Sequence, residues 1–252
     1  MSKHLNSSFQ RSDGELLEAI KAILKQRPSD GYRRVHVLLN NQRCENQSPA
    51  INHQRVYRLM KENQLLLARF GHKPVRVHDG KVITLHSNTR WCSDSFYMTC
   101  DNGDRVQVAF SMDTCDREAM RYVASTKGID GGMIRDLMAE TILYRFNTTG
   151  KVPHSVQWLS NNGSCYTAKE TVKFGRSMGL DIRTTPPYSP ESNGMAEAFV
   201  KTFKRDYVWF GDLSSAQRVI EQLPLWFEDY NENAPHKGLK MLSPRQFRKL
   251  GR

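Results

Sequence analysis

The sequence of 252 residues lacks any run of about 18 consecutive apolar residues, the length that a transmembrane helix needs. Its first residues, MSKHLNSSFQRSDG, also lack the apolar segment of a secretory signal peptide. No internal repeat or low-complexity tract is evident along the chain. These absences predict a globular cytoplasmic protein that does not enter a membrane.

Cysteine is scarce, with five residues, an odd number that contains no Cys-x-x-Cys pair. This count and the wide spacing exclude a disulfide framework and a zinc knuckle as the organising feature of the fold. We therefore expect reduced thiols, several of them buried as small apolar side chains. The five are Cys44, Cys92, Cys100, Cys115 and Cys165.

Acidic residues are few in the first part of the chain, which makes the net charge of +11 uneven. Residues 1–89 hold 15 Lys and Arg against 7 Asp and Glu, whereas residues 90–252 hold 22 against 19. A basic segment of this density favours a polyanionic partner, most simply nucleic acid, although charge alone carries no sequence preference. A basic surface that only confers solubility is the alternative.

Apolar residues recur at helical spacing in three stretches of this basic part, which are residues 16–24, 31–42 and 52–66. Ser12 and Asp13 precede the first stretch, and either is a suitable N-cap. Three short helices with basic outer faces predict a helix-turn-helix-like domain over residues 1–68, although any small helical bundle gives the same pattern. The side chains expected to contact DNA here are Arg33, Arg34, Arg55, Arg58 and Lys61.

Residues 69–89 lose this periodicity and predict an extended basic linker. After it, two strands flank the turn sequence Asp-Asn-Gly-Asp, a strong hairpin signal because Asn-Gly accepts positive φ angles. The order that follows is a third strand, a helix, a strand, a helix, a strand, a polar loop at 186–194 and a helix. It predicts an α/β ribonuclease-H-like fold, a mixed five-stranded sheet with helices on both faces, over residues 90–210. A C-terminal helical segment is expected at 211–252.

Two acidic residues and one amide are candidates for a site near the end of a strand of this sheet. Asp94 lies inside the first strand among apolar residues, where a carboxylate is costly unless it is paired or bound to metal. Ordinary hydrogen bonding explains it equally well. Asn161 follows the buried strand VQWLS, and Glu197 begins the last helix of the core. If position 161 held aspartate, the three would supply the carboxylate oxygens that hold two divalent ions for displacement at a phosphodiester.

The chain resembles the transposases of bacterial insertion sequences of the IS-three family, and within it the second-frame products of the insertion-element-two type. This family belongs to the retroviral-integrase superfamily, whose acidic triad has the same spacing between its second and third members as Asn161 and Glu197 have here, with 35 residues between them. The stretches that carry the resemblance are GYRRV, AINHQRVYRLMKEN, RWCSDSF, SPESNGMAEAFVKTFKRDY and YNENAPHKGLKMLSPRQF.

The resemblance implies magnesium- or manganese-dependent chemistry on double-stranded DNA, at the ends of the element and at its target. Water would attack one strand, and the freed 3′ hydroxyl would then attack another phosphodiester. The implied metal and catalytic residues are Asp94, Asn161 and Glu197, with Lys201, Lys204 and Arg205 on the DNA phosphates. A homo-oligomer on DNA, the first-frame product of the same element as a partner, and a nucleoid-associated location are implied as well.

Three features depart from the family. Asn161 stands where the family has aspartate, and an amide loses the negative charge that hard divalent ions need, so weak or absent metal binding is expected. Ala234 stands where the family usually has arginine before Pro235-His236, and the resemblance leads us to expect a shorter N-terminus than in relatives. These departures fit a decaying element copy.

Two other functions compete with a transposase. A DNA-binding remnant or modulator of transposition without catalysis is favoured by Asn161, whereas an RNA-strand nuclease on the same fold is disfavoured by the basic N-terminal domain. Three further residues are weaker candidates. Asp113 and Asp116 are more simply explained by surface hydrogen bonds or a pair with Arg117, and His236 by a solvated loop.

Overall fold

The structure, a computed structural model, describes residues 2–68, 84–185 and 194–251. Most of the predicted linker at 69–89 lies outside these residues, which resume at position 84. The predicted polar loop at 186–194 is also outside them, except for its last residue.

The chain divides into two compact units, one formed by residues 1–75 with 235–241 and the other by 76–234 with 242–252. The first unit contains three helices, α1 (Ser2–Gln26), α2 (Tyr32–Glu45) and α3 (His53–Glu62), together with the short 3-10 helix η3 (Lys237–Leu239). The apolar stripes predicted from the sequence meet in one core, which buries Leu16, Ile20, Ile23, Val35, Leu39, Val56, Leu59 and Met60.

Helix α1 begins at Ser2, ten residues before Ser12, the first of the two possible N-caps named from the sequence. The two N-cap candidates therefore lie inside the helix. Asp13 therefore does not cap the helix, and its carboxylate binds Arg55 and Arg58 on α3. Helix α3 begins where the sequence predicts, since the side chain of Asn52 accepts a hydrogen bond from the backbone N–H of Gln54.

The second unit contains a five-stranded sheet with the order β3-β2-β1-β4-β5. Its strands are β1 (Arg90–Thr99), β2 (Arg105–Asp113), β3 (Ala119–Ser125), β4 (Val156–Ser160) and β5 (Leu180–Thr184). The first three pair antiparallel, whereas β4 pairs parallel with both β1 and β5. The predicted mixed ribonuclease-H-like sheet is therefore confirmed.

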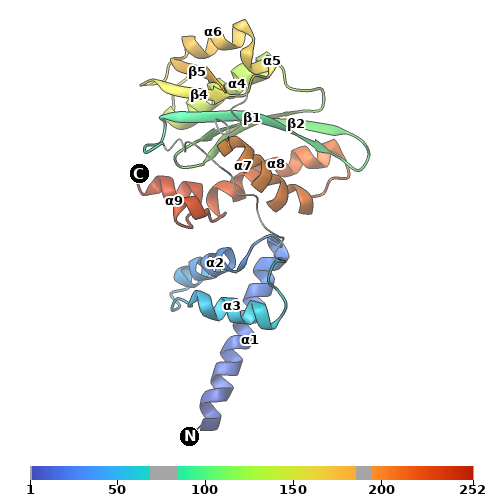
Figure 1. Cartoon of the computed structure of the whole chain (residues 1–252), viewed down its shortest axis with the longest axis vertical. Helices are drawn as coiled ribbons and strands as arrows, with labels where there is room; N and C mark the ends of the chain where they lie inside the picture. The colour runs from blue at the N-terminus through green and yellow to red at the C-terminus, as the bar shows by residue number, and fades with distance from the viewer. Residues whose placement is uncertain (1, 69–83, 186–193, 252) are drawn as a thin grey trace. The chain divides into compact units, whose positions relative to one another are not determined.

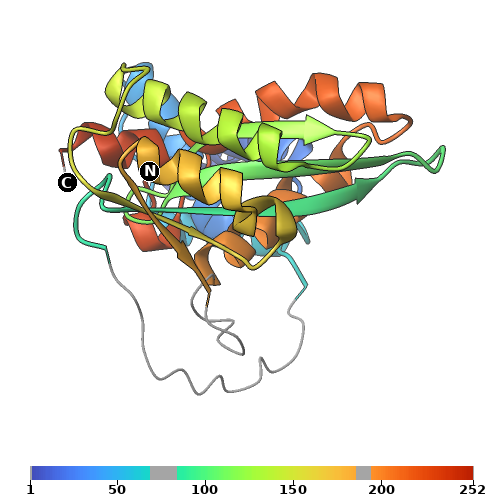
Figure 2. The ribbon, with the colours of Figure 1, turned by 90° about the horizontal axis from the view of Figure 1, so that it is seen from above.

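Helices cover both faces of this sheet (Figures 1 and 2). One face packs against α4 (Gly131–Phe146), α5 (Ser164–Thr167) and α6 (Lys169–Ser177), with Trp91 and Trp158 in the core between them. The other packs against α7 (Gly194–Asp206) and α8 (Ala216–Glu232), around an aromatic cluster that includes Phe110, Phe199, Phe203 and Phe227. Because side chains alternate along a strand, each strand supplies both cores.

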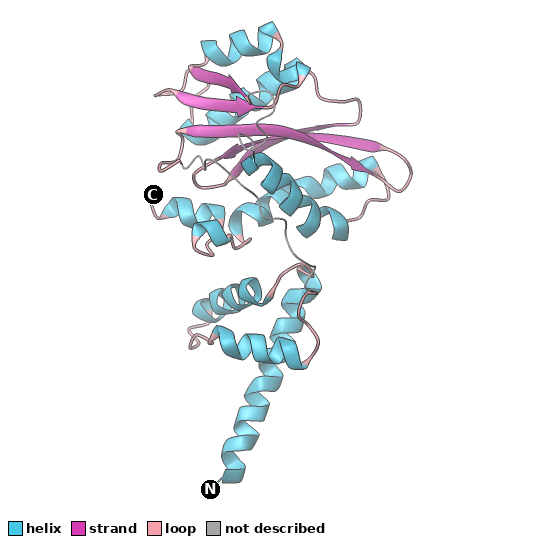
Figure 3. Ribbon diagram, viewed as in Figure 1, coloured by secondary structure: helices cyan, strands magenta, loops and turns pink. Residues whose placement is uncertain are grey.

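The C-terminal part of the chain is largely helical, as Figure 3 shows. The 3-10 helix η2 (Val208–Phe210) leads into α8, and α9 (Pro244–Lys249) closes the unit. Ser243 and Gln246 form a capping box at the start of α9, with Pro244 in its first turn. All five cysteines lie among the described residues and are free thiols, as expected.

Candidate active site

Asp94 lies in the middle of β1, on the face of the sheet that α7 and α8 cover. It shares this face with Cys92 and Phe96, both of which are buried in the aromatic core. The side chain of Asp94 is half-buried, and its Oδ1 accepts a hydrogen bond from the backbone N–H of Ser95 at 2.8 Å. The strand thus presents a carboxylate at the boundary between the core and solvent.

Asn161 is the first residue after β4, and the parallel pairing of β1 with β4 brings it beside Asp94. Ser93 is the register partner of Ser160, so the next residue of each strand lies at the same level. The Nδ2 group of Asn161 donates a hydrogen bond to Oδ1 of Asp94 at 2.6 Å. Its Oδ1 accepts one from the backbone N–H of Gly163 at 2.9 Å.

Gly163 is a residue of this site whose role the sequence analysis did not identify. A Cβ atom at this position would lie 2.9 Å from Oδ1 of Asn161, so a side chain would press on the amide that the backbone N–H holds. The sequence does signal the turn, since Asn-Asn-Gly-Ser directly follows a buried strand.

Glu197 lies in the first described turn of α7 and is exposed. Its neighbours Ala196 and Phe199 are buried against the sheet, which sets the rotation of the helix. Burial is the main cause that raises the pKa of Asp94, and the negative charge of Glu197 raises it further, against the hydrogen bonds from Ser95 and Asn161. The structure therefore joins Asp94 and Asn161 at the C-terminal end of β4, and the first described turn of α7 carries Glu197 near enough for its charge to act on Asp94.

The set of side chains at this site does not fit a pair of divalent ions. Such ions need anionic oxygens, and here the amide of Asn161 directs an N–H group at Asp94 and engages its own oxygen with Gly163. Among the residues that the structure describes, no group of three or more His, Cys, Asp or Glu side chains is placed to hold a metal ion.

The three cationic residues predicted to contact DNA from α7 have different surroundings. Lys201 is exposed, one turn after Glu197. Lys204 is half-buried, with its Nζ 5.6 Å from the centre of the Phe96 ring. Arg205 forms an ion pair with Asp206, with Nε and Oδ1 2.5 Å apart. Lys201 and Arg205 are thus exposed beside the site, and Arg205 is already engaged by Asp206.

The predicted DNA contacts of the helical unit also separate into two groups. Arg55 and Arg58 both bind the carboxylate of Asp13, each with a shortest N to O distance of 2.6 to 2.7 Å. Arg34 pairs with the buried Asp30 at 2.7 Å. The other two predicted contacts, Arg33 and Lys61, are exposed on α2 and α3.

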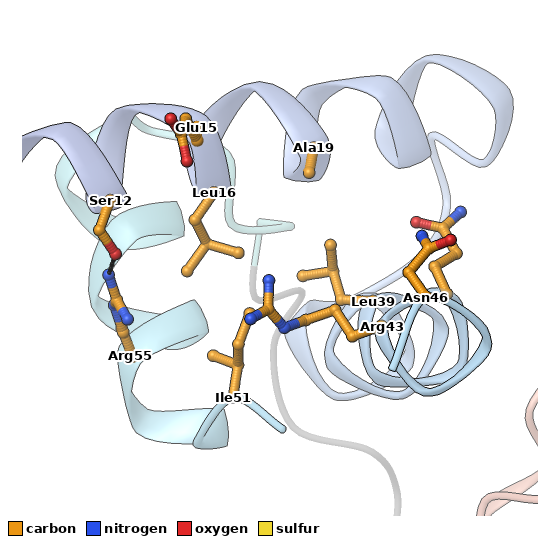
Figure 4. Close-up of a pocket in the computed structure, with 10 residues that line it drawn as sticks. Ser12, Glu15, Leu16, Ala19, Leu39, Arg43, Asn46, Ile51 and Arg55 are labelled. Atoms are coloured by element: carbon orange, nitrogen blue, oxygen red, sulfur yellow. Dashed lines mark hydrogen bonds between the residues drawn. The ribbon is translucent and has the colours of Figure 1, made fainter. Parts of the chain in front are cut away.

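A pocket of about 310 Å³ lies between α1, α2 and the start of α3 in the helical unit (Figure 4). Leu16, Leu39 and Ile51 form its apolar floor, which is continuous with the core of that unit. Arg43 extends across it, and its Nε donates to the backbone carbonyl of Pro49 at 2.7 Å. The hydrogen bond from Arg55 to Ser12, at 2.6 Å, lies at its edge.

The weaker candidates Asp113 and Asp116 are completely buried, so the expectation of surface hydrogen bonds was wrong. They contact Arg145 at 3.7 and 2.9 Å, in place of the expected pair with Arg117. Glu118, also completely buried, contacts the same guanidinium at 3.4 Å. This cluster is a structural ion network, and the sequence could not reveal it because Arg145 comes from α4.

His236 is half-buried, and its backbone carbonyl accepts hydrogen bonds from the N–H groups of Leu239 and Met241, at 2.9 and 2.8 Å. The segment therefore forms a tight turn around η3. Contact of its imidazole with DNA stays the weaker alternative to a solvated loop.

Comparison with protein families gives the class to which this fold and site belong. Two forms of the integrase core domain match residues 85–190 and 178–244, and an HTH-like domain matches residues 11–73. The protein is thus an integrase core preceded by a helix-turn-helix-like domain.

The relatives identify the family within this class. The chain is 44% identical to the transposase InsD of insertion element IS2D from Escherichia coli K12, over 95% of this chain and 80% of that protein. It is 43% identical to an uncharacterized 48.2 kDa protein of insertion element IS2A from Escherichia coli, of which it spans 58%. The chain belongs to the insertion-element transposases of the retroviral-integrase superfamily, a family of enzymes that cut and join DNA and typically use Mg²⁺.

A solved structure supports the fold independently. A chain of the simian T-cell lymphotropic virus intasome, determined in complex with a PP2A regulatory subunit, superposes with a TM-score of 0.55. The match covers 78% of this chain and 66% of that chain at 15% identity, so it concerns the fold alone. Within the described residues, no helix is long and apolar enough to cross a membrane.

Proposed function

We propose that this chain acts on double-stranded DNA, at the ends of an insertion element and at a target, as the integrase-type part of a transposase. The observation that supports the proposal is the contact of Asn161 with Asp94 at the C-terminal end of β4, close to the first described turn of α7, which carries Glu197. The 44% identity to transposase InsD supports the same reaction class.

The proposed roles follow from this arrangement. Asp94 and Glu197 are the two acidic groups of the site, and Asn161 occupies the position between them in the triad. In an active relative, the residues at these three positions would hold Mg²⁺ or Mn²⁺, which would supply activation of the attacking oxygen and charge stabilisation of the leaving oxygen. Lys201, with Lys204 and Arg205 beside it, would hold the phosphates of a strand lying across the site.

Because the donor set does not fit two divalent ions, we propose that the chain cuts and joins DNA slowly as it stands. Changing Asn161→Asp should raise the rate by more than about 100-fold, since changes further from a metal already cost 10- to 100-fold. A cleavage and strand-joining assay with both chains in MgCl2 measures this. Asn162→Asp is the matched control, because Asn162 bonds the carbonyl of Thr185 instead. Equal rates for the Asn161→Asp variant and the unmodified chain would remove position 161 from the site.

A DNA-binding protein without catalysis, a remnant or modulator of active copies, is the second candidate. The hydrogen bond between Asn161 and Asp94 favours it, because it joins the two groups without a metal. A gel shift with element-end DNA and no cleavage product, even after Asn161→Asp, is the result expected for this function.

Further parts of the proposal concern organisation and partners. We infer a DNA-binding domain at 1–68, a linker at 69–89, a catalytic core at 90–210 and a C-terminal segment at 211–252. We also infer a homo-oligomer on DNA, the first-frame product of the same element as a partner, and a cytoplasmic location at the nucleoid. Measuring the size of the DNA complex, with and without the first-frame product, tests both the homo-oligomer and the binding of that product.

A further inference from the structure

The amide of Asn161 connects two parts of the site that are distant in the sequence. Its Nδ2 donates to Oδ1 of Asp94 on β1, and its Oδ1 accepts from Gly163 in the turn after β4. The two bonds measure 2.6 and 2.9 Å, both within the normal range. The amide thus bridges a carboxylate and a backbone N–H group.

This bridge works in one orientation of the amide only. Turning the group over would place its oxygen against the oxygen of Asp94 and its NH2 group against the N–H of Gly163. Both contacts would be repulsive, because each would oppose two acceptors or two donors. The partners on either side therefore hold the N–H toward Asp94.

A metal ion would meet this orientation unfavourably. The one oxygen that Asn161 offers already accepts a hydrogen bond from Gly163, and the group that faces Asp94 is a donor. Only two carboxylates, Asp94 and Glu197, remain to offset the four positive charges of two divalent ions. The N–H group of Asn161 thus gives the carboxylate of Asp94 the electropositive neighbour that a metal ion would give it in a metal-binding site.

We propose that the side-chain amide of Asn161 replaces a divalent cation at this site, so that Asp94 and the turn after β4 keep their arrangement without metal. An aspartate at position 161 would reverse this dependence, since two carboxylates would then face each other where the amide and Asp94 now bond. That variant would need a cation to hold the same arrangement. The inference rests on the proposed function only in taking Asp94, Asn161 and Glu197 as the site.

Thermal unfolding of the full chain, followed by tryptophan fluorescence at pH 8, tests the proposal without DNA. All four tryptophans, at positions 91, 158, 209 and 226, belong to the sheet-containing unit, so the signal reports that unit alone. The unmodified chain should unfold at the same temperature in EDTA and in MnCl2. Asn161→Asp should unfold earlier than the unmodified chain in EDTA, and MnCl2 should raise its midpoint by about 5 °C or more.

Two further variants make the result decisive. Asn162→Asp adds the same charge one residue away and should not respond to MnCl2. Asn161→Ala removes the bridge without adding charge, so its midpoint should fall by about 3 °C and stay independent of MnCl2, even if the aspartate variant fails to fold. A metal-dependent midpoint in the unmodified chain, or an alanine variant as stable as it, would overturn the proposal. In separate assays, failure of both the unmodified chain and Asn161→Asp to bind or join DNA would count against the proposed function and not against this proposal.

Discussion

At the scale of single residues, one neighbouring side chain can decide whether a charged group is available to bind a ligand. Asp13 shows this in the helical unit, where its carboxylate holds both Arg55 and Arg58. Burial opposes ionisation of Asp13, but the hydrogen bonds from Arg58 and Arg55 outweigh it and lower its pKa. These two arginines are therefore engaged within the protein, although the sequence places them on a basic helix.

Changing Asp13→Asn should release Arg55 and Arg58 for phosphates. DNA binding should tighten, and the slope of log affinity against log salt should steepen by about 0.9 for each phosphate gained. Fluorescence anisotropy with duplex DNA over a salt series measures the slope. Glu45→Gln, at an exposed position on α2, changes the net charge equally and should leave the slope as it is. An unchanged slope in Asp13→Asn would mean that neither arginine reaches DNA.

The buried Asp113 makes the free energy of unfolding depend on pH. Burial is the main cause that raises its pKa to about 6, with help from the charge of Asp116 and against Arg145 and two backbone N–H groups. The folded protein thus binds this proton more tightly than the unfolded chain. The stabilisation is complete below the ordinary aspartate pKa of about 3.9 and is lost as the pH rises through about 6.

Asp113→Asn should therefore flatten the fall of the unfolding free energy between about pH 4 and pH 6. Urea unfolding followed by tryptophan fluorescence across this range measures the effect. Asp136→Asn, on an exposed part of α4, should keep the original slope. A variant that retains the full slope would assign the titration to another group.

At the scale of elements, α9 is fastened to the sheet-containing unit by charge. Arg245 binds the buried Glu118 at 3.0 Å, and it also binds Glu228 and Glu232 on α8, at 2.6 and 2.8 Å. Arg248 from the next turn of α9 binds Glu118 as well. A buried carboxylate is costly without partners, so these arginines make the last helix part of the unit.

Changing Arg245→Met should destabilise the sheet-containing unit by about 1 to 3 kcal/mol, because the buried carboxylate of Glu118 loses one of its cationic partners. Its other partners, Arg145 and Arg248, remain. Urea unfolding monitored by tryptophan fluorescence gives the value. Arg218→Met removes two exposed ion pairs, with Asp212 and Glu221, and should cost less than about 0.5 kcal/mol. Equal losses in the two variants would contradict the role of α9.

At the scale of the whole molecule, the excess of positive charge in residues 1–89 should govern DNA affinity. Binding through phosphates releases counterions, so log affinity should fall linearly with log salt, with a slope of about −0.9 per phosphate. Changing Arg33 and Lys61 together to alanine should reduce the slope by about 1.8. Anisotropy measurements on the full chain test this. Lys21→Ala is the control and should leave the slope as it is, because Lys21 already pairs with Glu18. An affinity that salt does not change would exclude the phosphate-based mode.

Much of the fold could be predicted because periodicity and turn chemistry are local. The stripe of Ile134, Leu137, Met138 and Ile142 is enough to indicate α4, and Asn102-Gly103 is enough to indicate the hairpin between β1 and β2. The start of α1 could not be predicted in this way. Whether Asp13 caps a helix or pairs with Arg55 and Arg58 depends on a third helix that lies 40 residues further along the chain.

The sequence by itself determined the family, the class of fold and the identity of the groups at positions 94, 161 and 197, since these follow from residue types and their spacing. The tertiary structure alone decided what those groups do to each other. Parallel pairing of β1 with β4 places Asn161 against Asp94, and the turn at Gly163 fixes which end of the amide faces the carboxylate. The direction of a hydrogen bond depends on contacts between segments that are 67 residues apart, and no local pattern contains them.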